Sequence, residues 1–426
     1  MPATVQQPLP HLQIDFPFAE ADRCVLCGLC LPHCPTYRLT EDENESPRGR
    51  ISLLRAMASA NLPVTREAGA HLSRCLGCRA CERVCPSGVH YGIILDAGRS
   101  LLASRLGTSR RERLLLVLMR HLDWLRPLTA IARVAQRFGV RKLLRSLGVM
   151  RWFGLQQAEA LLPELKPMPP WQTLYPAEGR QRERVALFLG CVARAVDGET
   201  LQAAIRLLTR LGHDVVVPAP QGCCGALYRE AGDQDGAAMM AAQNRSAFAE
   251  SGAQTILTLA SGCGAVLAGQ DFAGTPAVDI HAFLAERDMP ADCSFEPLRQ
   301  TVAVQDPCSL RNGLRTEQAV YRLLERIPEL QITALPENAI CCGGAGSYPL
   351  REPDFAQRLR APKLAALAQL KPDVLVSANI GCLLHLAAGI REQQLTIPVL
   401  HPVMLLERQL RRAETGSGLS AANRFR

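Results

Sequence analysis

The pattern of apolar and polar positions divides the chain into a helical N-terminal part and a C-terminal part of alternating strands and helices. Ile51, Leu54, Met57 and Ala58 recur at helical spacing, which predicts a helix that begins near Ser46-Pro47. Leucines and valines at positions 114, 117, 118, 122 and 125 predict amphipathic helices with arginines on the other face, one of them ended by Pro127. The first part is therefore expected to be mostly helical.

Short β-rich runs appear in the C-terminal part in two sets of three. They are Val185 to Leu189, Asp214 to Val217 and Thr255 to Leu259, followed by Val302 to Val304, Gln331 to Ala334 and Val374 to Val376. Helical segments separate the runs, and strands spaced by helices predict parallel βαβ units. We therefore expect two repeated α/β domains with parallel sheets.

Prolines mark the junction between the two parts. Residues 163–182 hold five of them, a density that no helix or strand interior tolerates, so we interpret this segment as a linker. The resulting organisation is multidomain. A helical domain (1–100) is followed by a basic helical connector (101–162), the linker (163–182), and two α/β units (183–297 and 298–426).

Two cysteine runs dominate the helical part. Both read C-x2-C-x2-C-x3-C-P, at Cys24 to Pro35 and at Cys75 to Pro86. In two-cluster ferredoxins this spacing places three thiolates around one iron-sulfur cube, while the fourth cysteine ligates the other cube. We therefore predict two 4Fe-4S clusters. Their metal ligands are Cys24, Cys27, Cys30 and Cys85 for one, and Cys75, Cys78, Cys81 and Cys34 for the other.

The prolines and arginines beside these runs have expected roles. Pro35 and Pro86 bias the preceding cysteine to an extended conformation, which turns its thiolate outward. A zinc site usually shows two C-x2-4-C pairs, so a third cysteine in each run favours clusters over zinc. Arg48 and Arg50 are expected to be solvated, with contact to a cluster as the alternative.

The C-terminal part carries a second cysteine pattern, and it is duplicated. Cys191 is followed after 31 residues by Cys223-Cys224-Gly225, and Cys308 after 32 residues by Cys341-Cys342-Gly343. A further cysteine follows in each unit, Cys263 or Cys382. Spacings between cysteines that agree to within one residue in the two units indicate a tandem duplication. Each element follows a strand, and ligands of open parallel sheets bind at the carboxyl ends of the strands, so each set is expected to converge on one site.

The duplicated cysteines are candidate cofactor ligands. The sets are Cys191, Cys223, Cys224 and Cys263, and Cys308, Cys341, Cys342 and Cys382. Four soft ligands suit an additional iron-sulfur cluster or zinc, although buried cysteine also serves as a small apolar residue. The glycine after each pair is expected to permit an unusual backbone angle. Cys293 lies outside the pattern and is expected to be structural.

Composition and charge narrow the function classes. The chain has 426 residues, 48% of them hydrophobic, and needs no disulfides for a core, so its 17 cysteines are expected to be ligands. We find no secretory start and no run of roughly 20 apolar residues, and expect a cytoplasmic protein. Residues 101–155 hold 12 Arg and Lys against two acids, a net charge of +10.

This basic stretch is interpreted as a solvated face or as a surface for an acidic partner or anionic lipid, which would be a peripheral membrane contact. Nucleic acid is not expected, because no aromatic stacking platform accompanies the charge.

The loop Gly343 to Gly346 lacks the spacing of a dinucleotide site, and a lone histidine such as His385 is more often structural than a ligand. A cluster accepts single electrons and no hydride, so a flavoprotein partner is implied.

With these residues in hand, the chain resembles the iron-sulfur subunits of bacterial glycolate oxidase (glycolate dehydrogenase). The resemblance rests on both cysteine runs, both Cys-Cys-Gly elements, and four further segments: Ser46-Pro-Arg-Gly-Arg-Ile51, Cys85-Pro-Ser-Gly-Val89, Ala260-Ser-Gly-Cys-Gly264 and Ala378-Asn-Ile-Gly-Cys382. The wider Cys-Cys-Gly family includes subunits of lactate-utilisation systems, anaerobic glycerol-3-phosphate dehydrogenase and heterodisulfide reductase.

The resemblance implies a fold and a role. The fold is a helical two-cluster ferredoxin-type domain followed by two Cys-Cys-Gly domains. The role is electron transfer from FAD-containing subunits that oxidise glycolate to glyoxylate toward an acceptor, membrane quinone. A lactate-oxidising complex and a thiol-disulfide reductase are the alternatives. Ala260 and Asn379 replace the first cysteine of the Cys-x-x-Cys that closes each heterodisulfide reductase repeat, which weighs against disulfide reduction.

Overall fold

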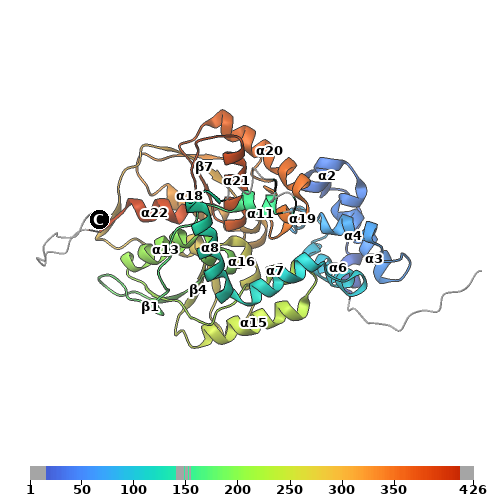
Figure 1. Cartoon of the computed structure of the whole chain (residues 1–426), viewed down its shortest axis with the longest axis horizontal. Coiled ribbons are helices and arrows are strands. Elements are labelled where there is room, and N and C mark those ends of the chain that lie inside the picture. Colours follow the sequence, from blue (N-terminus) through green and yellow to red (C-terminus); the bar gives the residue numbers. More distant parts are fainter. Residues whose placement is uncertain (1–15, 141–147, 149–151, 153–154, 413–426) are drawn as a thin grey trace, which may run out of the picture.

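The computed structural model describes residues 16–140, 148, 152 and 155–412. A helical domain lies at one end of the molecule, and two α/β units make up the rest (Figure 1). The sequence-based fold class is confirmed: a helical domain precedes two units with parallel sheets.

Short helices surround the cysteine runs in the first domain. They are α1 (Phe18–Asp22), η1 (Leu31–His33), α2 (Pro35–Thr40), η2 (Glu43–Glu45), α3 (Pro47–Ala58), α4 (Arg66–Ser73), α5 (Ala80–Arg83) and α6 (Tyr91–Leu106). The predicted helix is α3, and the Ser46 hydroxyl caps it by accepting a hydrogen bond from the amide of Gly49. Helix α6 continues through residue 100, where we had placed a domain boundary.

The connector is helical and corrects two expectations. Its elements are α7 (Arg110–Arg120), η3 (Leu122–Trp124), α8 (Leu125–Arg137) and α11 (Gln156–Leu161). Pro127 does not end a helix. It lies in the first turn of α8. Amides of the first turn find no acceptor within the helix, so a proline there removes no helical hydrogen bond. Leu114 and Val117 are exposed, and the buried side chains are Leu116, Met119, Leu122 and Leu125. The basic residues Arg141, Lys142, Arg145 and Arg151 lie outside the described residues.

All six predicted strands form, and all pair in parallel. The first unit contains β2 (Arg184–Phe188), α12 (Cys191–Val196), α13 (Gly198–Arg210), β3 (Asp214–Val216), α14 (Ala226–Glu230), α15 (Gln234–Ala249), β4 (Thr255–Thr258), α16 (Ser261–Leu267), β5 (Ala277–Asp279) and α17 (Ile280–Ala285). Strand β2 pairs with β3 and β4, and β4 pairs with β5. Buried residues such as Val185 and Leu257 line this sheet.

The second unit repeats this arrangement. It contains β7 (Thr301–Gln305), the π-helix η4 (Ser309–Leu314), α18 (Glu317–Leu324), β8 (Gln331–Ala334), α19 (Tyr348–Arg351), α20 (Pro353–Leu370), β9 (Val374–Ser377), α21 (Ile380–Glu392), β10 (Val399–Leu400) and α22 (Pro402–Gln409). The order β8-β7-β9-β10 matches β3-β2-β4-β5 of the first unit. The duplicated spacing thus corresponds to a duplicated topology.

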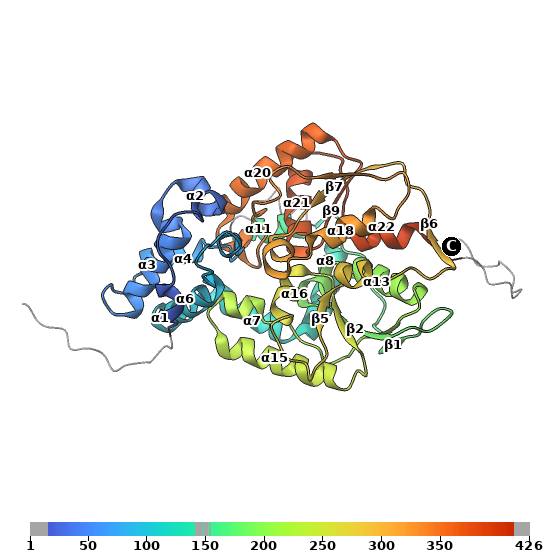
Figure 2. The same ribbon diagram turned by 180° about the vertical axis from the view of Figure 1, so that it is seen from behind.

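The expected linker contains a strand, contrary to our prediction. Leu174 and Tyr175 lie between Pro170 and Pro176 and form β1 (Leu174–Tyr175), which pairs antiparallel with β3. Two residues suffice for an edge strand, because the prolines fall outside the paired positions. The sequence also did not predict β5 and β10, or the antiparallel pair of β6 (Cys293–Phe295) and β11 (Leu410–Arg412). Cys293 is buried in β6, at the end of the molecule opposite the first domain (Figure 2).

The two units pack against each other in a nearly symmetric way. Helix α13 of the first unit lies on α22 of the second, and the corresponding pair α18 and α17 makes the reciprocal contact. One apolar core, which includes Leu208, Phe283, Leu324 and Leu406, runs through both units. Within the described residues, no helix combines the length and the apolar character needed to cross a bilayer.

Candidate functional site

In each α/β unit the four cysteines of the duplicated pattern meet at the carboxyl ends of the parallel strands. Cys191 opens α12 directly after β2, Cys223 and Cys224 follow β3, and Cys263 lies in α16 after β4. The Sγ atoms of Cys191 and Cys223 are 3.6 Å apart. The Cys224 thiol hydrogen-bonds to the thiols of both Cys223 and Cys263, so contacts connect all four sulfurs.

The second unit repeats this chain of contacts. The Sγ atoms of Cys308 and Cys341 are 3.8 Å apart, and those of Cys342 and Cys382 are 3.1 Å apart. Cys341 hydrogen-bonds to both Cys308 and Cys342. The structure therefore brings together both duplicated sets, as four thiols in each.

The glycine after each cysteine pair has the expected unusual backbone. Gly225 has a φ of +92° and Gly343 a φ of +86°, a region that side chains with a Cβ rarely adopt. A Cβ on Gly343 would lie 2.7 Å from the carbonyl oxygen of Ala356, whereas the closest atom to a Cβ on Gly225 is at 3.4 Å. The backbone therefore approaches more tightly in the second unit.

One thiol in each set is biased toward the thiolate. Hydrogen bonding to Cys191 and Cys224 lowers the pKa of Cys223 well below its usual value, although burial opposes this effect. In the second unit Cys342 has the lowered pKa, because of hydrogen bonds with Cys341 and Cys382. Thiolates are the form that binds soft metals, so both sets have the donor chemistry of an iron-sulfur or zinc site.

The first domain contains a small cavity whose wall includes Cys34, Cys75, Cys78 and Cys81. This is the set we predicted for one 4Fe-4S cluster, with Cys34 contributed by the other cysteine run. Cys34 has an extended backbone, and Pro35 begins α2 immediately after it. The Tyr91 hydroxyl donates to the Cys75 Sγ at 3.6 Å. Four thiols on one cavity fit a cluster held by four cysteines.

Arg50 contributes to the same cavity, so the expectation that it is solvated is wrong. It is fully buried and forms an ion pair with Glu45 at 2.6 Å. Its guanidinium also donates to Thr36 Oγ1 and to the His71 carbonyl. Burial alone would lower the pKa of Arg50, but the Cys75 thiol and its other neighbours raise it above the ordinary value. A permanent positive charge thus lies beside the thiols.

The other predicted set lies closer to solvent. Cys27 is exposed, whereas Cys24, Cys30 and Cys85 are partly buried. Arg23, beside Cys24, donates at 3.0 Å to the carbonyl of Ser87, which follows Cys85, and so ties the two runs together. Arg48 donates to the carbonyl of Leu26 at 2.7 Å. Burial raises the pKa of Cys30 to about 11.

The cavity cysteines lie directly against the second unit. Asn312, in η4, donates to the carbonyl of Cys78 at 2.8 Å, and Arg83 pairs with Glu317 at 3.1 Å. Burial, followed by the nearby Cys308, raises the pKa of the Cys78 thiol. Cys78 and Cys308 also pack on one apolar cluster with Cys341.

The two α/β sites also face each other. The Asn379 side chain accepts from the amide of Gly262 at 3.2 Å and donates to the Sγ of Cys382 at 3.6 Å. The hydroxyls of Ser261 and Ser309 are 2.8 Å apart, and each serine neighbours a site cysteine by one or two residues. The Asn379 side chain therefore links the segment that carries Cys263 to the Cys382 thiol.

The connector covers the first unit's thiols. Leu116, Met119 and Leu122 share an apolar cluster with Cys191, Cys223 and Cys224. The Tyr228 hydroxyl, from α14, donates to the carbonyl of Leu116 at 2.8 Å. Helix α7 and η3 are therefore part of the wall of this site.

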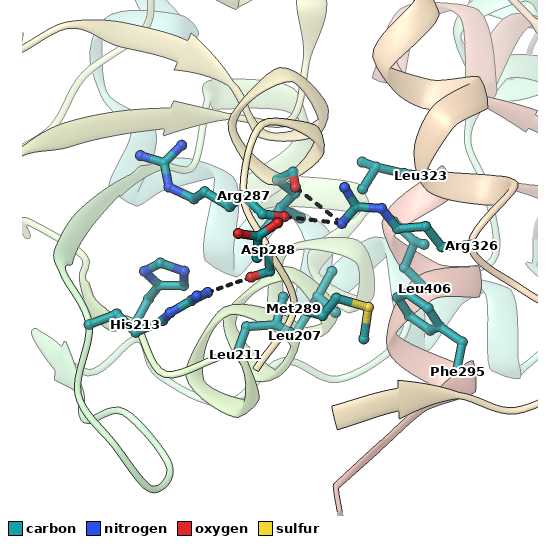
Figure 3. Close-up of a pocket in the computed structure, with 12 residues that line it drawn as sticks. Leu207, Leu211, His213, Arg287, Asp288, Met289, Phe295, Leu323, Arg326 and Leu406 are labelled. Atoms are coloured by element: carbon teal, nitrogen blue, oxygen red, sulfur yellow. Dashed lines mark hydrogen bonds between the residues drawn. The ribbon is translucent and has the colours of Figure 1, made fainter. Parts of the chain in front are cut away.

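The remaining candidates have structural contacts. His385 is buried, its Nε2 lies 3.1 Å from the carbonyl oxygen of Ala356, and burial lowers its pKa. Cys293 donates to the carbonyl of Arg210. A small cavity between the units has no cysteine in its lining, and its Arg326 is held by main-chain carbonyls (Figure 3). In the described part of the chain, no three His, Cys, Asp or Glu side chains are spaced to hold a single metal ion.

Sequence reasoning did not identify Glu45, Tyr91, Asn312 or the role of Asn379. Glu45 has a signal in retrospect, because it directly precedes the Ser46-Pro47-Arg48-Gly49-Arg50 segment. The contacts of Tyr91 and Asn312 depend on residues far away along the chain.

Arg50 provides a test of the buried ion pair. Replacing Arg50 by Met leaves Glu45 buried with fewer partners, so the free energy of unfolding of the first domain should fall by about 3 kcal/mol. Urea unfolding followed through the visible absorbance of the domain measures this change. Arg55→Met, in the same helix, removes an exposed pair with Asp22 and should change stability little. Equal midpoints for the two variants would contradict the role of Arg50.

Gly225 and Gly343, which follow the two cysteine pairs, can be compared by replacing each with alanine. Alanine at either position incurs the left-handed backbone cost of about 1–2 kcal/mol. Gly343→Ala adds a clash with the Ala356 carbonyl, so it should lose more iron than Gly225→Ala. Iron and acid-labile sulfide per chain give the readout. Iron content in Gly343→Ala equal to that of the unchanged protein would show that the backbone there does not position the thiols.

Family models match both cysteine-bearing regions. A 4Fe-4S dicluster domain model matches residues 20–89, and a model described as a cysteine-rich domain matches residues 185–268 and 302–387. Both α/β units therefore match the same model, in agreement with the duplication.

Two relatives match along almost their whole length. The probable glycolate oxidase iron-sulfur subunit of Bacillus subtilis is 34% identical over 403 residues, 88% of this chain and 90% of that protein. The glycolate oxidase iron-sulfur subunit of Escherichia coli is 34% identical over 408 residues, 91% and 93% of the two chains. Lactate utilization protein A of Geobacillus kaustophilus is 27% identical over 232 residues, but only 51% of this chain is covered. This chain therefore belongs to the family of glycolate oxidase iron-sulfur subunits.

Proposed function

We propose that this chain is the electron-transfer subunit of a glycolate-oxidising complex. An FAD-containing partner oxidises glycolate to glyoxylate, and this chain delivers the electrons to membrane quinone. Two relatives that match nearly the whole chain are named glycolate oxidase iron-sulfur subunits. The observation that carries the proposal is the hydrogen bond from Asn312 to the Cys78 carbonyl, because Asn312 lies in the helix that directly follows Cys308 and so joins the ferredoxin-type domain to the duplicated thiol sets.

The proposed ligands are the sets described above. Cys24, Cys27, Cys30 and Cys85 hold one 4Fe-4S cluster, and Cys34, Cys75, Cys78 and Cys81 hold the second. The duplicated sets, from Cys191 and from Cys308, each hold a further iron-sulfur cluster, for which their four thiols supply the ligands. Bound iron-sulfur clusters accept and release electrons singly.

The four thiol sets follow one another through the molecule. The loop around Cys27 is exposed, and the apolar side chains of Val25, Leu26 and Leu29 surround it. An exposed apolar patch of this kind suits the docking of a protein partner, so we assign electron entry to this end. The cavity with Cys78 comes next, then the set with Cys308, and the bridge through Asn379 leads to the set with Cys263.

The chain's own residues tune this path. Arg50 places a positive charge beside the cavity thiols, and Tyr91 donates a hydrogen bond to Cys75. Hydrogen bonds and charge at the sulfurs set cluster potentials, so these two side chains are positioned to adjust the second cluster. Asn379 acts in the same way at Cys382.

Reconstitution with the flavin-containing subunits tests the proposal. This chain alone should reduce no dye with glycolate, and adding the flavoprotein should give glycolate-dependent quinone reduction. D-lactate and L-lactate, offered in parallel, test the alternative substrate. Activity with a disulfide and no partner would instead favour a thiol-disulfide reductase.

A cysteine substitution locates the path. Cys78→Ser should lower quinone reduction by at least about tenfold, since ligand geometry is lost, while glycolate still reduces the partner's flavin. Cys293→Ser removes a buried thiol outside the four sets and should leave quinone reduction unchanged. Quinone reduction at the original rate in Cys78→Ser would refute the relay.

A further inference from the structure

An apolar stripe on α8 faces solvent. We define the α8 ridge as the exposed side chains of Trp124, Leu128, Ile131, Val134 and Phe138. Their spacing of three or four residues places them on one side of the helix. Ile131 is 68% and Phe138 77% exposed. Leu114, on the preceding α7, is also exposed, at 71%.

The ridge is not the side of α8 that packs on the rest of the protein. Another side of α8 packs on the protein through the buried Leu125. Gln136 fixes the same helix, because its Nε2 donates to the Pro163 carbonyl at 2.8 Å and its Oε1 accepts from the amide of Leu165 at 2.9 Å. The helix is therefore held with its apolar stripe in solvent.

Arginines follow the ridge. Arg126, Arg133 and Arg137 recur along α8 on a different side from the apolar stripe, and α7 adds four more: Arg110, Arg111, Arg113 and Arg120. Glu112 and Asp123 are the acidic residues of this stretch. The surface thus combines a continuous apolar stripe with a strongly cationic flank.

We propose that the α8 ridge docks this protein onto the surface of an anionic phospholipid bilayer. Helices that lie in the membrane interface carry Trp, Phe and Leu on one face and Lys or Arg on the other. The apolar stripe enters the boundary between headgroups and acyl chains, and the arginines pair with anionic headgroups. Charge complementarity favours the lipid surface, because this flank would meet many negative groups at once. An acidic protein is the competing partner.

Docking in this way has a consequence for electron exit. The segments that carry the surface, α7 and η3, also cover the first unit's thiols: Leu116, Met119 and Leu122 pack with Cys191, Cys223 and Cys224. Figure 1 shows α7 and α8 running from the first domain over the α/β units. The set with Cys191 would then be the one nearest the membrane. This step rests on the proposed function, which assigns quinone as the acceptor.

Vesicle sedimentation tests the docking. The full chain, prepared anaerobically with its clusters, is mixed with vesicles of phosphatidylcholine alone or with phosphatidylglycerol. It should pellet with the anionic vesicles, and less so as salt is raised. Arg126→Gln, Arg133→Gln and Arg137→Gln together should weaken binding about 100-fold, since each arginine near the surface contributes about fivefold. Ile131→Gln with Phe138→Gln should weaken it at least about tenfold.

Matched variants separate the ridge from general charge and hydrophobicity. Arg66→Gln, Arg322→Gln and Arg408→Gln remove three exposed charges elsewhere, and Leu174→Gln with Leu370→Gln removes two exposed leucines. Both sets should pellet like the unchanged protein. Equal pelleting of the ridge variants, or no binding to anionic vesicles, overturns the inference. So does capture of the flavin-containing subunit through the ridge without vesicle binding. The assay needs no glycolate, so its failure leaves the relay standing.

Discussion

The hydrogen bond from Asn312 to the carbonyl of Cys78 lies at the seam on which the rest of the arrangement depends. The seam holds the thiols of the first domain close to those of the second unit through both polar and apolar contacts. Arg83 pairs with Glu317, and Arg38 pairs with Glu337 on the rim. Leu76 and Tyr348 fill the space between them. Without this docking, the ferredoxin-type domain and the duplicated units would be two separate metal-binding proteins.

Much of the fold was predictable because it depends on local patterns. The six strands from Val185 to Val376 were visible as β-rich runs, and the rule for parallel sheets placed the cysteines after each run at one edge. The exception is β1. Leu174 and Tyr175 have no strand pattern of their own, and they pair only because β3 offers them a free edge.

The sequence predicted that the duplicated cysteines meet within each unit, but it did not predict the surroundings of these cysteines. Cysteine spacing is written in the chain, whereas the contact between Asn312 and Cys78 spans 234 positions. Periodicity likewise shows that a helix has an apolar face but not what that face meets. Leu114 and Val117 were grouped correctly as apolar positions of a helix, yet they face solvent, and Leu116 and Met119 face the thiols. Burial of Arg50 required knowing that Glu45 is buried beside it.

The reciprocal packing of α13 on α22 and of α17 on α18 is the contact expected between two copies of one subunit. In a true homodimer both faces would be identical, because the same surface of each subunit forms the interface. Because both copies lie in one chain, each can carry residues that differ from those of the other. The second copy has a π-helix after Cys308 and Asn379 beside Cys382, where the first has an α-helix and Ala260. Broken symmetry of this kind makes the surroundings of the two thiol sets chemically different, which a pair of identical subunits cannot achieve.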